Sequence, residues 1–497
     1  MNILVAIANY GTTNDAYLAR VLSAYRSMPY KIDIVVLSNI SKDFGSDVEV
    51  ITGLPNKNPH SLPFAHKRVF AERKEAYDLF IYTEDDILIT QRNIEAFLRV
   101  TSLLPPHEVA GFFRWEQYPD GTKYYPDAHA FHRWLPDSLK VIGSHTFARF
   151  TNEHSGCFAL TRGQLAKAIA SGGFLVSPHE HKHRLLETAA TDPYTQCGFT
   201  KVICLSHFDE LLVPHLPNRY IGSRLGVDAS EFHKQIDALL GQRGGLRPNG
   251  SLLEPVTKVF HCEWSRDHYE PCRADLIAMF PSATRTVLSI GCGSGETEAE
   301  LMSKGIAVTA IPVDSVIAAC AESRGVEIIY GDMQAAMAQL RGRQFDGVLM
   351  SGVLHLFQNP GKTLGCASSL LVKNGVLVAT VPVFLRLPFL WLWLRHPLRY
   401  QGWRNFSRSG VHPVGRRRAR TLFRDAGLLL EKIVGTVPER WKTLVASSGG
   451  LAEPLFSSEY TFLGRRAGAT EKANSSVWRE SKIEPEMTCM ADRSPSQ

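Results

Sequence analysis

Three consecutive acidic residues, Glu84, Asp85 and Asp86, interrupt the otherwise apolar stretch FIYTEDDILIT. Mutual repulsion and desolvation make such a cluster unfavourable unless a positive charge lies among the carboxylates. Hard divalent cations take oxygen ligands, and a bound cation would also bridge to the phosphates of a nucleotide. The trio therefore indicates group transfer from a nucleotide diphosphate, with the cation stabilising the departing diphosphate. A solvated acidic turn, or a metal site without catalysis, is the alternative.

The elements that must position this trio follow from the pattern around it. The apolar runs NILVAIAN, IDIVVLSN and LFIYTEDD are typical of strands, and helical stretches over 15–25 and 65–77 separate them. Such βαβαβ spacing predicts a mainly parallel sheet that binds ligands at the carboxyl ends of its strands. Because alternate strand residues share a face, we expect Glu84 and Asp86 on one side and Asp85 on the other.

The segment 1–222 resembles the GT-A glycosyltransferases, in which a buried strand ends in an acidic DxD motif. The resemblance implies that Asp86 binds Mn²⁺ or Mg²⁺, that Asp85 contacts the donor sugar or ribose, and that Glu84 lies beside them. In that family a histidine late in the domain often completes the metal site. His215 in LVPHLPNRYIG has the matching place, and a structural histidine is the alternative.

The same resemblance implies a site for a nucleotide-sugar donor, built from several short segments. The residues expected near its base, ribose or phosphates are Ala8, Asn9, Tyr10, Asn39, Lys67 and Arg68. Asn39 ends the second strand, where the family often has an acid, so the nucleotide is left open. A solvated basic turn is the alternative for the two cations. The carboxylates that could deprotonate an acceptor hydroxyl are Asp192, Glu187 and Glu153. The run HEHKH (179–183) allows either a zinc site or a polar loop.

A glycine-rich turn in the second half, VLSIGCGSGETEAEL, holds Gly291, Gly293 and Gly295. Glycines let the chain turn sharply and let an anionic ligand approach helix N–H groups closely. A dinucleotide-binding loop would need GxGxxG, but Glu296 takes the last position. The GxGxG pattern and the runs IIYGDMQAA, FDGVLMSGVLHLFQNP and LLVKNGVLVATVP resemble class I S-adenosylmethionine-dependent methyltransferases over 259–463. This resemblance implies that Asp332 contacts the adenine.

Some positions depart from that family. Pro312 replaces the acid that usually holds both ribose hydroxyls, and Asp314 follows two residues later. Losing a charge-assisted ribose contact costs about 1.5–3 kcal/mol. His355 and His412 are the candidates for a base, which methylation of a hydroxyl needs. The fold is expected to survive these departures, and a degenerate, inactive methyltransferase domain is the alternative to an active one.

Length, composition and charge limit the number of domains, the kinds of partner and the cellular compartment that we expect. A chain of 497 residues with 44% hydrophobic and 21% charged residues indicates two or three globular domains. A net charge of +6 does not indicate a protein that binds nucleic acid, and nine cysteines without a CxxC pair favour a reducing cytosol. The N-terminal run is typical of a first strand rather than a signal peptide. The apolar run 384–395 is too short to span a bilayer; it would cover the fold or lie in a membrane interface.

These patterns predict an α/β chain with two Rossmann-like modules. The expected boundaries are a GT-A nucleotide-diphospho-sugar transferase fold over 1–240, a linker over 241–256, a seven-stranded class I methyltransferase fold over 257–466 and a disordered tail over 467–497. The expected function is metal-dependent glycosyl transfer to a glycan or lipid-linked glycan, and methylation of a sugar hydroxyl, in surface polysaccharide synthesis. The expected place is the cytoplasm, either free in it or at the inner face of a membrane. A non-catalytic protein that binds glycans or nucleotides is the alternative.

Overall fold

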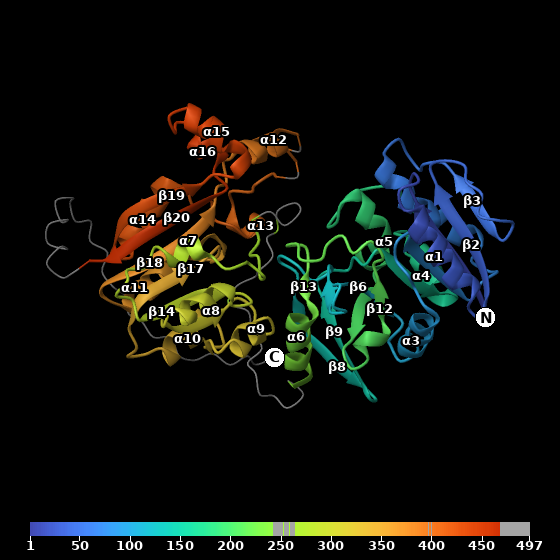
Figure 1. Ribbon diagram of the computed structural model, residues 1–497, viewed down its shortest axis with the longest axis horizontal. Helices are drawn as coiled ribbons and strands as arrows, with labels where there is room; N and C mark the ends of the chain where they lie inside the picture. The colour runs from blue at the N-terminus through green and yellow to red at the C-terminus, as the bar shows by residue number, and fades with distance from the viewer. Residues whose placement is uncertain (242–251, 253–257, 259–263, 396, 399, 468–497) are drawn as a thin grey trace, which may run out of the picture.

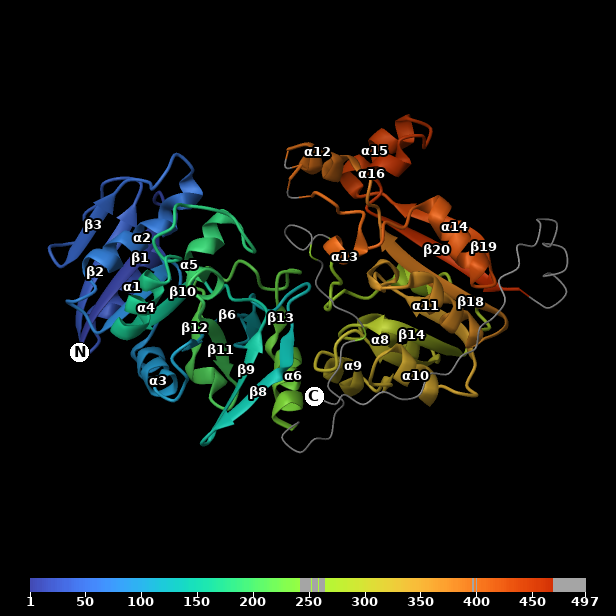
Figure 2. The ribbon, with the colours of Figure 1, turned by 180° about the vertical axis from the view of Figure 1, so that it is seen from behind.

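The computed structural model describes residues 1–241, 252, 258, 264–395, 397–398 and 400–467, which form two halves joined side by side (Figures 1 and 2). Most of the predicted linker and all but one residue of the predicted tail lie outside the described residues. Within the described part, no helix is long and apolar enough to cross a bilayer.

The N-terminal half is built on a five-stranded sheet with the strand order β10-β4-β1-β2-β3. Four strands are parallel and β10 is antiparallel to β4. The strands are β1 (Asn2–Asn9), β2 (Lys31–Ser38), β3 (Val48–Thr52), β4 (Leu79–Glu84) and β10 (Cys157–Thr161). The flanking helices are α1 (Asp15–Arg26), η1 (Pro59–Phe64), α2 (Ala65–Glu72), α3 (Gln91–Thr101) and α4 (Arg162–Ala170). The predicted βαβαβ unit is confirmed, although α2 is shorter than the pattern predicted.

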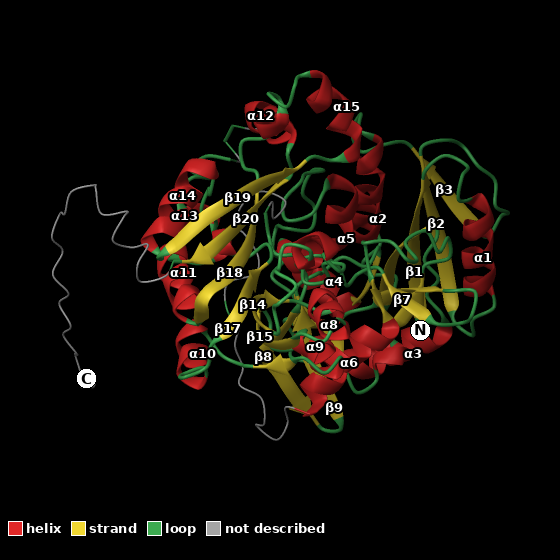
Figure 3. Cartoon of the chain, turned by 60° about the vertical axis from the view of Figure 1, so that its left-hand side comes forward, coloured by secondary structure: helices red, strands yellow, loops and turns green. Residues whose placement is uncertain are grey.

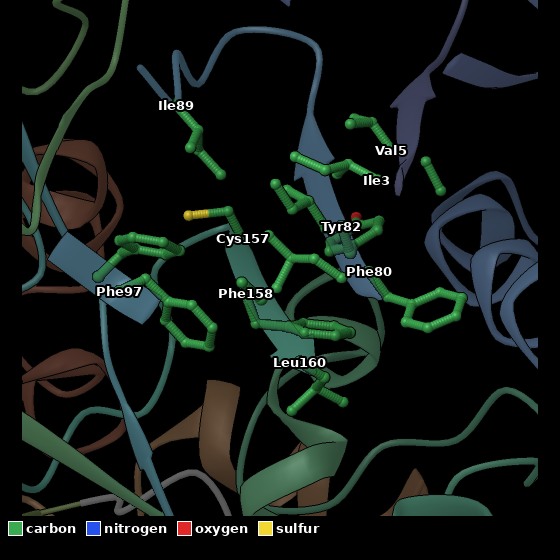
Figure 4. Packing of buried hydrophobic residues seen from close by; sticks show 14 of the residues in the cluster. Ile3, Val5, Phe80, Tyr82, Ile89, Phe97, Cys157, Phe158 and Leu160 are labelled. Carbon is green, nitrogen blue, oxygen red and sulfur yellow. The ribbon is translucent and has the colours of Figure 1, made fainter. Parts of the chain in front are cut away.

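The runs 3–8 of β1 and 79–82 of β4 are apolar and buried because both faces of this sheet are covered, as a parallel sheet requires. Figure 4 shows the result: Phe80 and Tyr82 of β4 lie beside Phe158 and Leu160 of β10 in one packed core. The rings of Tyr82 and Phe158 are 5.7 Å apart. This core fixes the carboxyl end of β4, where the acidic trio begins.

Two smaller four-stranded sheets complete the N-terminal half, and sequence patterns did not predict them. One has the order β5 (Glu108–Ala110), β11 (Thr200–Cys204), β9 (His145–Phe150), β8 (Trp134–Ile142). The other has the order β12 (Leu212–Pro214), β6 (Phe113–Gln117), β7 (Lys123–Tyr125), β13 (Val227–Asp228). Helix α5 (Leu185–Thr195) precedes β11, the short turn η2 (Phe208–Glu210) links β11 to β12, and α6 (Ala229–Gly241) follows β13. An isolated bridge pairs Ile87 with His215 and brings the end of β12 against the acidic turn.

The C-terminal half is one seven-stranded sheet with the order β16-β15-β14-β17-β18-β20-β19. Its strands are β14 (Thr286–Cys292), β15 (Ala307–Pro312), β16 (Glu327–Ile328), β17 (Phe345–Met350), β18 (Leu371–Pro382), β19 (Leu428–Thr436) and β20 (Glu459–Arg466). Strand β20 is antiparallel to both of its neighbours, and the other pairs are parallel. The predicted seven-stranded Rossmann-like sheet is confirmed.

Eleven described helices accompany this sheet. They are α7 (Ala274–Ile277), α8 (Glu296–Ser303), α9 (Ala318–Ser323), α10 (Met333–Gln339), η5 (Leu354–Leu356), α11 (Pro360–Ser369), α12 (Leu387–Arg395), α13 (Phe406–Ser409), α14 (Arg416–Asp425), α15 (Glu439–Ser447) and α16 (Glu453–Phe456). Helices α12, α15 and α16 gather at one end of this half (Figures 1 and 2), and Figure 3 shows α12 and α15 there as well.

The two halves share a packed interface, with α6 against α9 (Figures 1 and 2). Val316, just before α9, is fully buried in an aromatic cluster of the N-terminal half that includes Trp134 and Phe232. An ion pair of 2.7 Å joins Glu231 of α6 to Arg324, which follows α9. The halves are therefore not independent units joined only by a linker.

Candidate functional sites

The acidic trio lies where β4 ends. The parallel register pairs Ala8 with Glu84, so Asn9 at the end of β1 lies beside Asp85. Asp85 accepts hydrogen bonds from the side-chain amides of Asn9 at 2.6 Å and Asn14 at 2.7 Å. Asp86 lies on the opposite side of the turn toward β12, although Asn14 also reaches it at 3.2 Å. The strand stops at Glu84, and the side-chain amide of Asn14 reaches both aspartates, so the expected separation of Asp85 and Asp86 onto opposite faces of a strand does not apply here.

The positive partners of the trio come from the protein. His215 Nε2 is 3.5 Å from Asp86 Oδ2, and its Nδ1 is 2.5 Å from Glu116 Oε1. Arg219 Nη2 lies 3.3 Å from Asp86 Oδ2. Burial alone would lower the pKa of His215, but its bonds to Asp86 and Glu116 raise it above the ordinary value. His215 is therefore held as an ion-pair partner of two acids, and its predicted role as a metal ligand would require it to give up the contact with Asp86.

Part of the acidic charge has no partner. Glu84 Oε1 and Asp86 Oδ1 are buried and have no hydrogen-bond partner among the described residues. Burial and repulsion from Asp86 raise the pKa of Glu84 to about 8, and burial raises the pKa of Asp85 to about 6. Two such orphaned oxygens suit a hard cation. Mg²⁺ is commonly held by one or two protein carboxylates while substrate phosphates and water supply the rest.

A cation at this turn would have Glu84 and Asp86 as its carboxylate ligands. No group of three or more His, Cys, Asp or Glu side chains is arranged to hold a metal in the described part of the chain. That finding also applies to HEHKH (179–183), so the zinc alternative gains no support. A cation would depend on a bound diphosphate for its remaining ligands.

The loop after β1 is held by hydrogen bonds that involve Asn39 and Asn9, two of the residues predicted to lie near the nucleotide. Asn39 Oδ1 accepts the backbone N–H of Gly11 at 2.7 Å. Lys42 reaches both Asn9 Oδ1 and Asp15 Oδ1 at 2.5 Å. Ala8 is buried, whereas Tyr10 is exposed at the rim of the site. Four residues of this site were not predicted from the sequence: Asn14, Lys42, Glu116 and Arg219. Of these, only Arg219 could have been found from its position, because it follows the predicted His215 by four residues.

Two cations predicted near the phosphates lie elsewhere. Lys67 is buried, forms an ion pair with Asp192 and lies 4.5 Å from the ring centre of Phe64. Arg68 projects from the surface of α2 and pairs with Glu72 at 2.6 Å. Both predictions need correction, because the helix turns Lys67 into the core and Arg68 toward solvent.

A cavity of about 220 Å³ lies beside Glu84, and only one of the three candidate bases lines it. Glu187 lines it, together with Arg114. Asp192 does not, because it is fully buried against Lys67 and lies 3.3 Å from His179. The prediction of Asp192 as a base is therefore wrong.

Glu153, the third candidate, is fixed by Lys182 at 2.7 Å and His183 at 3.1 Å. Burial alone would raise its pKa, but His183 and Lys182 lower it to about 2. So acidic a carboxylate is a poor base, and it does not line the cavity.

Four histidines also line this cavity, and sequence patterns did not group them: His129, His132, His154 and His183. Burial lowers the pKa of the first three, so they are neutral near pH 7. Neutral imidazoles both donate and accept hydrogen bonds. The cavity thus combines these imidazoles with the carboxyl groups of Glu84 and Glu187 and the guanidinium of Arg114, a lining that suits hydroxyl groups.

The glycine turn of the C-terminal half has the contour that the sequence predicts. Gly291 and Gly295 have φ near +91° and +92°, a region that only glycine adopts freely. A Cβ atom on Gly293 would lie 2.2 Å from the carbonyl oxygen of His268. The amide of Ser294 donates to that same oxygen at 2.8 Å.

The segment 264–273 lies over this turn and fills it; we call it the strap. Arg266 of the strap pairs with Glu270 at 3.0 Å and reaches the carbonyl of Gly291 at 3.4 Å. The cavity left at the turn is about 10 Å³, room for one water molecule at most. The backbone contour therefore fits S-adenosylmethionine, but the space does not until the strap moves.

The two aspartates predicted to contact the cofactor, Asp332 and Asp314, both accept backbone hydrogen bonds in this structure. Asp332 is exposed and caps α10 by accepting the amide of Ala335 at 2.8 Å. Asp314 is buried, accepts the amides of Val316 and Ile317 at 2.9 and 3.0 Å, and pairs with Arg133 of the N-terminal half at 3.4 Å. Its carboxylate supports the interface rather than facing a ribose site.

The two histidines proposed as bases also have structural contacts. His355 is buried, bonds to the carbonyl of Trp264 at 2.8 Å, and burial lowers its pKa to about 4. His412 is less buried, and its Nε2 is 3.0 Å from the carbonyl of Gln358. Of the two, only His412 retains access to solvent.

Comparison with known proteins identifies relatives of the C-terminal half. A family model described as a methyltransferase domain matches residues 252–432. Over 114 residues the chain is 30% identical to an uncharacterized methyltransferase of Mycobacterium tuberculosis (strain ATCC 25618 / H37Rv), covering 22% of this chain and 55% of the relative. An uncharacterized methyltransferase of Mycobacterium bovis matches with the same values. The chain thus spans about half the length of the curated relatives it matches.

Solved structures give similar matches. A SAM-dependent methyltransferase from Archaeoglobus fulgidus is 18% identical, with a TM-score of 0.30, and the match covers 39% of this chain and 90% of that chain. An S-adenosylmethionine-dependent methyltransferase from Mesorhizobium loti is 17% identical, with a TM-score of 0.29, and the match covers 39% of this chain and 96% of that chain. The family model and the seven-stranded sheet confirm the predicted methyltransferase domain in the C-terminal half.

Proposed function

We propose that the chain combines a metal-dependent glycosyltransferase, in its N-terminal half, with an S-adenosylmethionine-dependent methyltransferase that acts on a sugar hydroxyl. The shared product would be a methylated surface glycan, built on a glycan or lipid-linked glycan acceptor. The observation that carries the first activity is the pair of buried, unpartnered carboxylate oxygens of Glu84 and Asp86 at the end of a parallel strand. The family match over 252–432 carries the second.

Several features support glycosyl transfer. The carboxyl end of a parallel strand is the usual place for a ligand in an α/β fold. A cation held there by Glu84 and Asp86 would offset the charge of a departing diphosphate. Asn9, Asn14 and Lys42 lie next to Asp85 or the loop that borders it, where polar groups of a nucleotide sugar would find donors and acceptors.

The acceptor would occupy the cavity of about 220 Å³ beside Glu84. Glu187 is the candidate base there, since it lines the cavity and the other two candidates do not. Its role would be to take the proton from an acceptor hydroxyl as that oxygen attacks the donor sugar. Neutral histidines in the wall would orient further hydroxyls by donating and accepting hydrogen bonds.

Methyl transfer depends on a movement of the strap. Because Arg266 and Glu270 fill the glycine turn, S-adenosylmethionine would enter only after they shift. The filled turn also favours a second candidate, a glycosyltransferase whose methyltransferase domain no longer binds its cofactor. The two differ in whether the full chain binds S-adenosylmethionine.

The test uses the full chain and a panel of nucleotide sugars, with Mn²⁺ or with excess chelator. We expect donor hydrolysis or transfer that needs the metal and is lost in Asp86→Ala, while the surface control Glu72→Gln retains it. Activity that is unchanged in chelator or in Asp86→Ala would refute the glycosyltransferase assignment. In parallel, radiolabelled methyl transfer to the glycosylated product tests the C-terminal half, and no binding of S-adenosylmethionine would favour the second candidate.

A further inference from the structure

Helix α12 presents an apolar stripe to solvent. Leu387, Trp391 and Leu394 recur at the four- and three-residue spacing that places side chains on one face of a helix. Trp391 is 57% exposed and Leu394 is 72% exposed, and Leu398 just beyond the helix is 84% exposed. Large apolar side chains seldom gather on a surface without a partner.

The opposite face of α12 is fixed to the protein. Phe389 is buried in a cluster of aromatic residues, with its ring 4.6 Å from Trp264 and 5.3 Å from Trp403. This packing prevents the helix from turning its stripe inward. The exposed stripe is therefore held outward by the fold.

The surroundings of the stripe are strongly basic. No aspartate or glutamate occurs between Asp346 and Asp425, a stretch that holds ten arginines and two lysines. Arg395 lies over the ring of Trp391 at 4.7 Å, and Arg404 lies over the ring of Trp403 at 5.3 Å. Neither arginine forms an ion pair with a described acidic residue, and both are exposed.

A second apolar group lies beside α12. Helix α15 is next to it in all three views, and α16 is next to it in Figures 1 and 2. Leu444, Leu451 and Leu455 are exposed there, while Trp441 and Phe456 pack together at 4.8 Å. We call α12, residues 397–398 and residues 439–456, which include α15 and α16, the apolar cap.

We propose that the apolar cap binds the surface of an anionic lipid bilayer, with its leucines and Trp391 in the interface and its arginines on the lipid phosphates. Exposed Trp and Leu beside Arg are the combination that the boundary between headgroups and acyl chains accommodates. The acids of the apolar cap, Glu439 and Glu453, form ion pairs with Lys442 and Arg416. The absence of acidic residues across 347–424 then favours an anionic surface over a second copy of this chain, whose matching face would carry the same excess of positive charge. This inference does not depend on either proposed activity.

The geometry places this surface close to a site. Helix α12 follows the carboxyl end of β18, the edge of the sheet at which a Rossmann-like domain binds its ligands. His355 at that edge lies 5.8 Å from Phe384, measured between ring centres, and Phe384 belongs to the aromatic cluster under α12. A bilayer bound to the apolar cap would thus lie at the same edge of the C-terminal half.

The experiment is co-sedimentation of the full chain with vesicles of phosphatidylcholine alone, or with phosphatidylglycerol at about one part in three. We expect at least about tenfold tighter partitioning to the anionic vesicles, weakening as salt increases. Leu394→Glu should reduce that partitioning by about tenfold or more. The matched control is Leu175→Glu, a leucine of the N-terminal half that is 54% exposed and should change nothing.

Tryptophan fluorescence gives a second readout. A blue shift should accompany binding to anionic vesicles and should decrease in Trp391→Phe, which preserves an aromatic ring at that site. Equal partitioning to both vesicle types, no partitioning, or equal losses in the Leu394 and Leu175 variants would overturn the proposal. A dimer in solution that Leu394→Glu dissociates would also overturn it, because the partner would then be a second copy.

Discussion

The Nε2 atom of His215 lies 3.5 Å from Oδ2 of Asp86, and its other ring nitrogen is 2.5 Å from Oε1 of Glu116. The imidazole thus lies between two acids that favour its protonated form, which would offset the acidic turn without a metal ion. A divalent cation and the protonated imidazole would compete for Asp86, since each is stabilised by the same carboxylate.

Replacing Asp86 tests both sides of that competition. In Asp86→Asn we expect the pKa of His215 to fall, because the variant loses an ion-pair partner that raises it. Mn²⁺ binding should weaken by about a hundredfold or more, since a charged ligand is lost. Histidine signals in an NMR titration report the first effect and calorimetry the second. An unchanged His215 pKa, with Glu72→Gln as control, would show that Glu116 alone sets it.

Glu153 should make the protein sensitive to acid. Its folded pKa is about 2, below its ordinary value of 4.5, so its contribution to stability is fully present above pH 4.5. That contribution is lost as the pH falls from 4.5 toward 2. We expect Glu153→Gln to lower the free energy of unfolding by about 1–2 kcal/mol at pH 7 and by much less near pH 3. Urea unfolding at the two pH values is the measurement, and equal losses at both would contradict the prediction.

Cofactor entry should open the strap. If S-adenosylmethionine binds at the glycine turn, the hydrogen bond from Ser294 to the His268 carbonyl must break, and so should the bond from His268 to the Ala130 carbonyl. Saturating cofactor should therefore raise hydrogen exchange at these two amides. Amides of β1 serve as the control and should not change. Binding without faster exchange would mean that the cofactor occupies another place.

Val316 tests the coupling of the two halves. Val316→Ala should destabilise the fold by about 1–2 kcal/mol and reduce exchange protection in α6, because the side chain fills a cluster of the N-terminal half. Val308→Ala is the matched control, since Val308 is buried within the C-terminal half. It should cost a similar amount without changing α6. Two separate unfolding transitions in calorimetry of the unmodified chain would contradict this coupling.

Much of the sheet framework was predictable because it depends on local pattern. Continuous apolar runs identified β1, β2, β4 and most strands of the second sheet, and the acids at Glu84–Asp86 follow directly from the end of β4. The small antiparallel sheets carry no comparable signal, since their strands are short and depend on partners distant in sequence. Glu116 and His215 meet only through such pairing.

The side-chain roles were harder to predict for a related reason. Lys67 was interpreted as a phosphate contact, yet Phe64 and Phe70 lie three residues to either side, so the helix period places all three on one buried face. That signal was present in the sequence. No local pattern could show that Arg133 would meet Asp314, because that contact exists only when the halves dock.

The ion pair of Lys67 and Asp192 also limits how this protein can evolve. Both side chains are almost completely buried, so losing either one leaves a charge without a partner in the core, at a cost of about 3–5 kcal/mol. Joint replacement by apolar residues of similar volume would be far less harmful. Among relatives that share this half, the two positions should therefore change together, 125 residues apart in the chain. His179, 3.3 Å from the same carboxylate, should change with them.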